Sequence, residues 1–171
     1  MKKTLRVFVL LVSCVLINVF NINLAHAGAQ NFLISDFHAD YYLSLDKEGR
    51  SFLKTVESIT AVFPNYDQNH GIERAIPKTY DGHPVTLNIQ SINDENGASQ
   101  RYSKYTSNGN LVVRIGDAGK YIHGPKTYVI TYTQRDVTKY FADTNDDEFY
   151  WDINGVGWSQ VFSQVSATVH I

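Results

Sequence analysis

The stretch DTNDDEFYWDINGVGW, residues 143–158, contains both tryptophans of the chain and its densest cluster of acidic residues. Its acidic first part is typical of a turn, the mostly apolar residues at 149–153 are typical of a strand, and the glycines at 155 and 157 predict a second turn. Large aromatic side chains bury roughly 150 to 250 Å² each, so we expect this stretch to anchor the hydrophobic core. The remaining strands are then expected to pack around it.

Alternating apolar and polar residues predict strands before and after this stretch. The first two, at 33–45 and 52–63, are predicted to form a long hairpin that turns at 46–49. Residues 65–82 are predicted as an irregular connection because glycine and proline interrupt them. Further strands are predicted at 85–90, 101–106, 111–115, 127–133 and 161–169.

These strands define the expected fold class. About seven to nine strands joined by short turns, with no convincing helix after residue 27, are typical of an all-β protein. We therefore expect an antiparallel β-sandwich, either immunoglobulin-like or jelly-roll-like, preceded by a helical signal peptide.

Residues 1–27 have the organisation of a secretory signal peptide. A basic start precedes an apolar run at 7–17, and small residues end the segment at Ala27, directly before Gly28. We expect cleavage between Ala27 and Gly28, followed by export. An uncleaved membrane anchor is one alternative, but asparagines shorten the apolar run below the ~20 residues that span a bilayer. Lipidation at Cys14 is another, but the apolar segment continues past this cysteine.

The remainder, residues 28–171, has the size of a single extracytoplasmic domain. Removing 27 of 171 residues leaves 144, enough to bury a core without a disulfide. Cys14 is the only cysteine in the chain, so we expect the exported domain to lack a thiol nucleophile and any cysteine zinc site. Three of the 15 basic residues belong to the signal peptide. The exported domain therefore has 12 basic and 17 acidic residues, which gives it a formal charge of −5. This charge argues against nucleic acid or anionic lipid as a partner.

No catalytic or cofactor motif is complete in the sequence. Residues 157–161, GWSQV, lack the closing glycine of a serine-hydrolase elbow, and residues 155–160 lack the third glycine of a dinucleotide loop. The histidines after residue 27 stand singly, which does not favour a zinc site. We therefore expect no catalytic residue, no metal and no cofactor.

The acidic turn at 143–147 has two further interpretations. Oxygen-bearing side chains at Asp143, Asn145 and Asp147 alternate as in a calcium loop, but the glycine and the bidentate acid of such a loop are missing. Asp and Asn also cap their own backbone in turns, so we expect no tight calcium binding. Acids close to Trp151 would also suit a carbohydrate-active enzyme, since glycoside hydrolysis uses two carboxylates beside a bound sugar.

One charged residue, Glu57, falls in the apolar phase of the second predicted strand. Acids are almost never fully buried unless they are paired, so Glu57 either reaches water at a sheet edge or has a partner. Arg74, between Ile72 and Ile76, has the planar, two-pronged donor that suits a carboxylate. We predict that Glu57 and Arg74 form a structural ion pair that holds the 65–82 connection on the sheet.

An ordered series of short motifs resembles one protein family. It comprises TVESI at 55–59, HGIERAIP at 70–77, IGD at 115–117, TYVITY at 127–132 and DEFYWDING at 147–155. The series resembles the N-terminal extracytoplasmic domain of predicted bacterial membrane proteins in the domain-of-unknown-function family numbered 2207, over residues 32–171. The resemblance implies an outward-facing domain tethered by membrane segments beyond residue 171, or else a secreted stand-alone version. It implies no catalytic residue, because the family has no established activity.

The leading functional expectation is a non-enzymatic ectodomain that binds an unknown protein or a component of the cell envelope. The alternative is a carbohydrate-active enzyme that uses acids near Trp151. Exposed carboxylates clustered in a cleft would favour the enzyme, whereas aromatic residues packed among strands would favour a binding or structural module.

Overall fold

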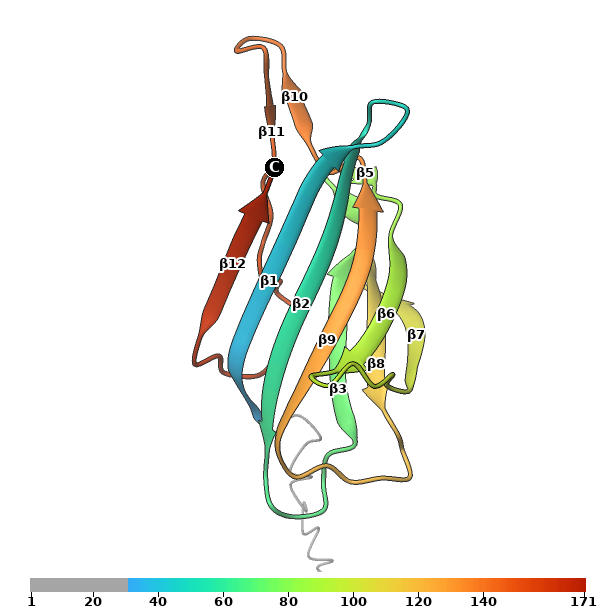
Figure 1. Cartoon of the computed structure of the whole chain (residues 1–171), viewed down its shortest axis with the longest axis vertical. Helices are drawn as coiled ribbons and strands as arrows, with labels where there is room; N and C mark the ends of the chain where they lie inside the picture. The colour runs from blue at the N-terminus through green and yellow to red at the C-terminus, as the bar shows by residue number, and fades with distance from the viewer. Residues whose placement is uncertain (1–30) are drawn as a thin grey trace, which may run out of the picture.

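The computed structural model describes residues 31–171, which form strands and loops without a helix (Figure 1). The all-β class predicted from the sequence is therefore confirmed for this part of the chain. The predicted signal peptide at 1–27 and its cleavage site at Ala27 and Gly28 lie outside the described residues. Within 31–171, no helix has the length and apolar character needed to cross a membrane.

The larger sheet has five strands in the order β12-β1-β2-β9-β6. These strands are β1 (Leu33–Leu45), β2 (Ser51–Phe63), β6 (Asn88–Asp94), β9 (Gly124–Arg135) and β12 (Val165–His170). The β1–β2 hairpin matches the one predicted from the sequence, with register partners from Leu33 and Val62 to Leu45 and Ser51. β9 pairs with β2 along nearly its whole length, so β2 lies at the centre of the sheet.

One pairing of this sheet departs from the antiparallel expectation, because β12 runs parallel to β1. A parallel pair needs a long connection that returns the chain to its starting side. Here the return includes residues 149–162, which we call the strap. They contain no regular strand, and an isolated bridge joins Phe162 to Ile34 at the start of β1.

The smaller sheet has three antiparallel strands in the order β3-β8-β7. They are β3 (Gly71–Pro77), β7 (Tyr102–Ser107) and β8 (Asn110–Gly116). The prediction that residues 65–82 are irregular is wrong for β3. Every second side chain of β3 faces inward, but one of these inward-facing residues is the charged Arg74. Because a charged residue stands where an apolar one is expected, the sequence does not show the apolar and polar alternation of a strand.

Two short hairpins complete the described fold: β4 (Thr79–Tyr80) with β5 (His83–Pro84), and β10 (Lys139–Phe141) with β11 (Asp146–Glu148). The β10–β11 hairpin extends beyond the end of the larger sheet (Figure 1). The strand predicted at 149–153 is wrong, since β11 consists of three exposed acidic residues and ends before the aromatic ones. The aromatic side chains alternate as in a strand, but no neighbouring strand pairs with their backbone.

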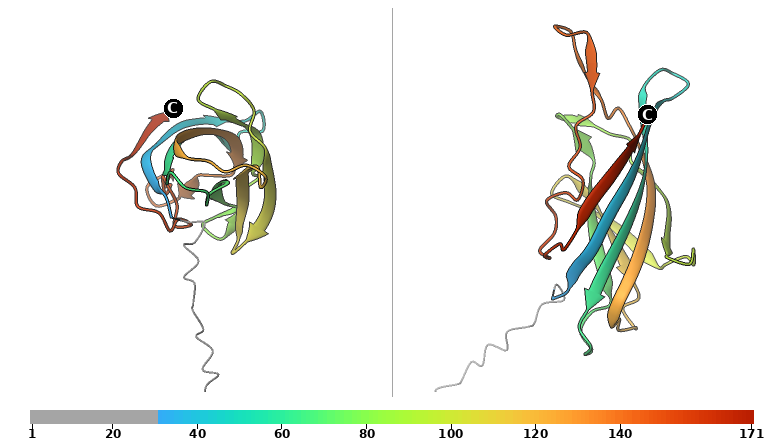
Figure 2. Two further views of the ribbon diagram at one scale, coloured as in Figure 1. Left: turned by 90° about the horizontal axis from the view of Figure 1, so that it is seen from below. Right: turned by 60° about the vertical axis from the view of Figure 1, so that its left-hand side comes forward.

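A single hydrophobic cluster joins the two sheets and the strap. The larger sheet contributes side chains such as Phe37 and Ile130, and the smaller one contributes Ile76 and Val113, all essentially inaccessible to water. Figure 2 shows the long strands curving around one side of the molecule. The side chains that the strap packs against this cluster are only partly buried: Phe149, Trp151, Ile153, Trp158 and Phe162. The aromatic part of the stretch at 143–158 therefore covers the core and does not form its centre, and the acidic part lies on the exposed β10–β11 hairpin.

Candidate functional site

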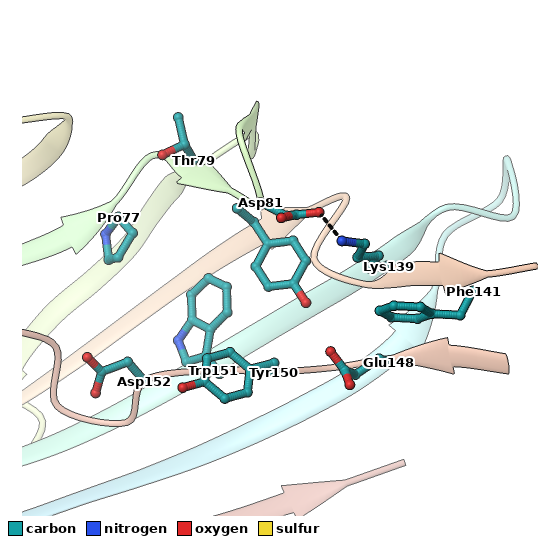
Figure 3. A pocket seen from close by; sticks show the side chains of 10 residues that line it. Pro77, Thr79, Asp81, Lys139, Phe141, Glu148, Tyr150, Trp151 and Asp152 are labelled. Atoms are coloured by element: carbon teal, nitrogen blue, oxygen red, sulfur yellow. Dashed lines mark ion pairs between the residues drawn. The ribbon is translucent and has the colours of Figure 1, made fainter. Parts of the chain in front are cut away.

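A cleft of about 350 Å³ opens where the β4–β5 hairpin, the β10–β11 hairpin and the start of the strap meet (Figure 3). We call it the aromatic cleft. Four of its lining residues are aromatic and four are charged. The full lining is Pro77, Thr79, Tyr80, Asp81, Lys139, Phe141, Glu148, Tyr150, Trp151 and Asp152.

Trp151 is the fixed aromatic ring of the cleft. Its indole stacks on Phe149 at a centroid distance of 5.9 Å and an angle of 9°, and on Tyr80 at 6.1 Å and 22°. The neighbouring Tyr150 is 71% exposed, because successive side chains of an extended chain point in opposite directions. The cleft therefore combines one supported ring, Trp151, with one largely exposed ring, Tyr150.

The charged residues of the cleft are unevenly balanced. The Asp81 carboxylate and the Lys139 ammonium form an ion pair of 2.7 Å, and the same ammonium lies 5.2 Å from the centre of the Phe141 ring. The hydrogen bond that Lys139 donates to Asp81 lowers the pKa of Asp81, and the same bond raises the pKa of Lys139. Within residues 31–171, neither Glu148 nor Asp152 forms a salt bridge. Three carboxylates and one ammonium give the cleft a formal charge of −2.

Glu57 and Arg74, the pair predicted from the sequence, lie together in the core behind the strap. The Arg74 Nη2 and Nε atoms donate to the two carboxylate oxygens of Glu57 at 2.7 and 2.8 Å. The Tyr132 hydroxyl donates a third hydrogen bond to Glu57, at 2.8 Å. The Glu57 and Arg74 side chains are 0% and 1% exposed, so the alternative of an edge position reaching water is wrong.

The electrostatics of Arg74 and Tyr132 follow from their burial and from Glu57. Burial alone lowers the pKa of Arg74, but the adjacent Glu57 carboxylate more than offsets this, and the pKa is raised above its ordinary value. Burial also raises the pKa of Tyr132, and the negative charge of Glu57 raises it further. Arg74 is therefore a permanent cation and Tyr132 a neutral donor in this network.

Arg74 connects the core to the strap. Its Nη1 atom donates to the Asn154 carbonyl at 3.0 Å, and the Trp158 indole nitrogen donates to the same oxygen at 2.8 Å. The Tyr41 hydroxyl donates to the neighbouring Ile153 carbonyl at 3.1 Å. The pair was expected to hold the 65–82 connection, and this detail is corrected: Arg74 belongs to β3, and the segment it holds is the strap.

Two glycines allow the strap to approach β3 this closely. Gly155 has a φ of 71°, and a Cβ atom there would lie 3.1 Å from Nη1 of Arg74. A Cβ atom on Gly157 would lie 2.8 Å from the Cβ of Ala75, closer than real Cβ contacts. The turn that these glycines predict from the sequence is therefore also a point of close packing. It places the start of the strap, with Trp151, at the edge of the cleft.

The residues considered for calcium lie on the β10–β11 hairpin. Asn145 has a φ of 59° and its side-chain oxygen accepts a hydrogen bond from the Tyr140 hydroxyl at 2.9 Å. Asp143 and Asp147 are exposed on either side of it. In the part of the chain that the structure describes, no three His, Cys, Asp or Glu side chains are grouped to hold a metal ion. The absence of tight calcium binding stays a prediction.

Sequence reasoning selected Trp151 and its nearby acids but missed the opposite wall of the cleft. Tyr80 and Asp81 come from the β4–β5 hairpin, far from residue 151 in the chain, and Lys139 comes from β10, which precedes the strap. The Asp81-Gly82 dipeptide is a turn signal, and its positive φ values of 43° and 82° fit a tight hairpin. Nothing in that signal indicates which distant segment the hairpin faces.

The fold and this site define an all-β domain with two sheets on one core and a strap that forms an aromatic cleft. The model of the family described as "Predicted membrane protein (DUF2207) N-terminal domain" matches residues 34–171, and the chain belongs to this family. The resemblance drawn from the sequence motifs is thereby confirmed. A search of curated proteins found no match to the chain.

Several solved structures align with part of this chain at low similarity. Yeast LTA4 hydrolase in complex with bestatin has 11% identity and a TM-score of 0.41, over 60% of this chain and 14% of that one. Native leukotriene A4 hydrolase from Saccharomyces cerevisiae has 9% identity and a TM-score of 0.41, over 60% and 15%. A putative protease from Parabacteroides distasonis has 12% identity and a TM-score of 0.35, over 68% and 25%. The aligned regions are a quarter or less of those chains, and the similarity does not bear on function.

Proposed function

We propose that this chain is a non-enzymatic, extracytoplasmic binding domain of a membrane-associated bacterial protein. Its partner is a protein or another component of the cell envelope, and its binding site is the aromatic cleft. In this proposal the two sheets act as a β-sandwich scaffold, and the strap is the element that presents the site.

One observation supports this role above the others. Trp151 is supported from behind by Phe149 and flanked by Tyr80, while Tyr150 beside it remains 71% exposed. Aromatic residues of this kind, with an apolar ring and a polar edge, are enriched where proteins meet partners. Arg74 fixes the strap through the Asn154 carbonyl, so the rings are positioned before any partner arrives.

The family description supports membrane association, and the sequence of residues 1–27 supports export. In a bacterial host, we expect the exported product to begin at Gly28. Intact-mass measurement tests this directly. Retention of Met1, or the added mass of a diacylglycerol group on Cys14, would contradict cleavage between Ala27 and Gly28.

A photocrosslinking amino acid placed at Tyr150 tests the binding site in the producing bacterium. We expect a discrete adduct with an envelope component when the crosslinker replaces Tyr150. The matched control replaces Tyr105, an exposed tyrosine on β7 of the smaller sheet. Adducts of equal yield from both positions, or no adduct from Tyr150, would contradict the assignment of the cleft as the binding site.

A carbohydrate-active enzyme is the second candidate, because carboxylates do line the cleft beside Trp151. Such an enzyme needs one carboxyl group that stays protonated and a second that is ionised. Asp81, with its lowered pKa, suits only the ionised role. Hydrolysis of chromogenic glycosides that is lost in Glu148→Gln would favour this enzyme over the binding domain.

A further inference from the structure

We propose that the aromatic cleft and the β10–β11 hairpin together bind a basic peptide segment, with an arginine or lysine side chain inserted beside Trp151. This inference rests on the proposed binding function and specifies the chemistry of the partner. It follows from the rings, from the charge of the cleft and from the charge of the hairpin beside it.

The rings of the cleft suit a cation. The faces of tryptophan and tyrosine attract ammonium and guanidinium groups through the negative potential of the ring. Lys139 already shows this preference within the cleft, since its ammonium lies over the Phe141 ring. Within residues 31–171 no ammonium or guanidinium group lies over the ring of Trp151 or Tyr150, and both residues stand next to Glu148 and Asp152.

The charge of the cleft selects the class of ligand. Asp81 and Lys139 neutralise each other at 2.7 Å, which leaves Glu148 and Asp152 as the excess charge. Figure 3 shows Glu148, Tyr150 and Trp151 along one segment, across from the joined Asp81 and Lys139. An anionic ligand would meet like charges there. A neutral sugar would contact the rings but would leave the net charge of −2 uncompensated.

The neighbouring hairpin extends the same charge beyond the cleft. All three residues of β11 are acidic and exposed, and Asp143 stands at the turn. Across the hairpin, β10 carries one cation, Lys139, which is committed to Asp81. A lone small amine would use only the cleft. A peptide with several basic residues would complement both the cleft and the hairpin, and this extended complementarity identifies the occupant as a peptide segment.

The experiment uses the purified protein labelled with ¹⁵N. The chain has two tryptophans, so the indole N–H region contains two resonances. Trp151 reports on the cleft, and Trp158, whose indole donates to Asn154, is the internal reference. The probe is an acetylated hexapeptide containing three arginines, and the matched control replaces each arginine by citrulline, which has the same shape without the charge. Diacetylchitobiose is the neutral sugar probe.

We expect the arginine peptide to shift the Trp151 resonance in a saturable manner and the citrulline peptide to bind at least about tenfold more weakly. Raising the salt concentration from about 0.05 M to about 0.5 M should weaken binding, because exposed charges are screened. Glu148→Gln and Tyr150→Ala should each weaken it by about 3- to 10-fold. Glu95→Gln, which removes one exposed acid from the turn after β6, should leave the affinity unchanged.

The other outcomes are equally decisive. Equal binding of the arginine and citrulline peptides would overturn the cation assignment. Tighter binding of diacetylchitobiose than of the arginine peptide would overturn it as well, while leaving the cleft as a binding site of other chemistry. If no probe shifts Trp151, the basic-peptide inference is wrong, and the adduct at Tyr150 then decides separately whether the proposed function holds.

Discussion

Arg74 donates hydrogen bonds to both carboxylate oxygens of Glu57, at 2.7 and 2.8 Å, at a point of the core where neither side chain is more than 1% exposed. Such a pair is costly to desolvate, so its net contribution to stability is small or even unfavourable compared with apolar residues of the same shape. Its specific effect is geometric. The remaining guanidinium nitrogen, Nη1, reaches the Asn154 carbonyl and so fixes the strap on β3.

The first prediction concerns this pair. Glu57→Gln and Arg74→Met should each reduce the free energy of unfolding by ~3 to 5 kcal/mol, because each leaves a buried charge without its partner. The double variant should lose much less than the sum of the two. Denaturant midpoints for the three variants measure the coupling. A coupling energy below ~0.5 kcal/mol would mean that the two residues act independently.

The second prediction concerns the strap. Trp158→Phe removes the indole hydrogen bond to Asn154 and should cost about 1 to 2 kcal/mol. Since Arg74 still holds the Asn154 carbonyl, the core should remain folded while the strap opens more often. Hydrogen exchange should therefore speed up in residues 149–162 more than in β2 and β9. Uniform acceleration across all three segments would contradict this role for the indole.

The third prediction concerns the pairing of β3 with β8. Gly116 has a φ of 143°, and a Cβ atom there would lie 2.0 Å from the His70 carbonyl oxygen. Gly116→Ala should therefore cost at least about 3 kcal/mol. The control is Gly109→Ala, where φ is 77° but no atom lies within 4 Å, and only backbone strain of about 1 to 2 kcal/mol applies. Equal midpoints for the two variants in chemical denaturation would refute the steric argument.

The fourth prediction concerns alkaline pH. Burial raises the pKa values of Tyr41, Tyr128 and Tyr132 above the ordinary value of 10.0. Above pH 10 the unfolded chain loses these protons while the folded chain retains them, so the folded state binds more protons and stability falls as pH rises. Each tyrosine contributes a slope of about 1.4 kcal/mol per pH unit. Unfolding curves between pH 8 and pH 12, each about a unit apart, measure the total slope.

Tyr128→Phe is the matched variant for the alkaline prediction. Its hydroxyl is buried and has no hydrogen-bond partner within residues 31–171, so the substitution removes a titrating group without breaking a hydrogen bond there. We expect a shallower decline above pH 10 and no loss of stability at pH 7. An unchanged slope would show that Tyr128 does not hold its proton in the folded state.

The fifth prediction concerns calcium. Asp143, Asn145 and Asp147 supply an incomplete set of oxygen ligands on the β10–β11 hairpin, so calorimetric titration should detect no tight calcium binding. Micromolar affinity that disappears in Asp147→Ala would overturn this expectation. Retention of that affinity in Asp147→Ala would place a calcium site elsewhere in the protein.

The long strands were predictable because their side chains alternate. In β2 and β9 every second side chain faces the core, and backbone pairing on both edges keeps that period regular. The same reasoning failed at β3, where the inward-facing Arg74 pairs with the Glu57 carboxylate on β2 and with the Asn154 carbonyl of the strap. It also failed at 149–153, where alternating aromatic residues cover the core without pairing to a neighbouring strand.

The sequence by itself determined the all-β class, the family, the β1–β2 hairpin and the presence of a charge at an inward position of β2. These depend on local periodicity and on the order of motifs, and both can be read directly from the amino-acid sequence. Only the tertiary structure decided that β12 runs parallel to β1, that the strap is held by Arg74, and that Tyr80 and Asp81 face Trp151. Each of these depends on contacts between residues that are distant in the chain. Packing and burial set the free energies of such contacts, and the contacts leave no local pattern in the sequence.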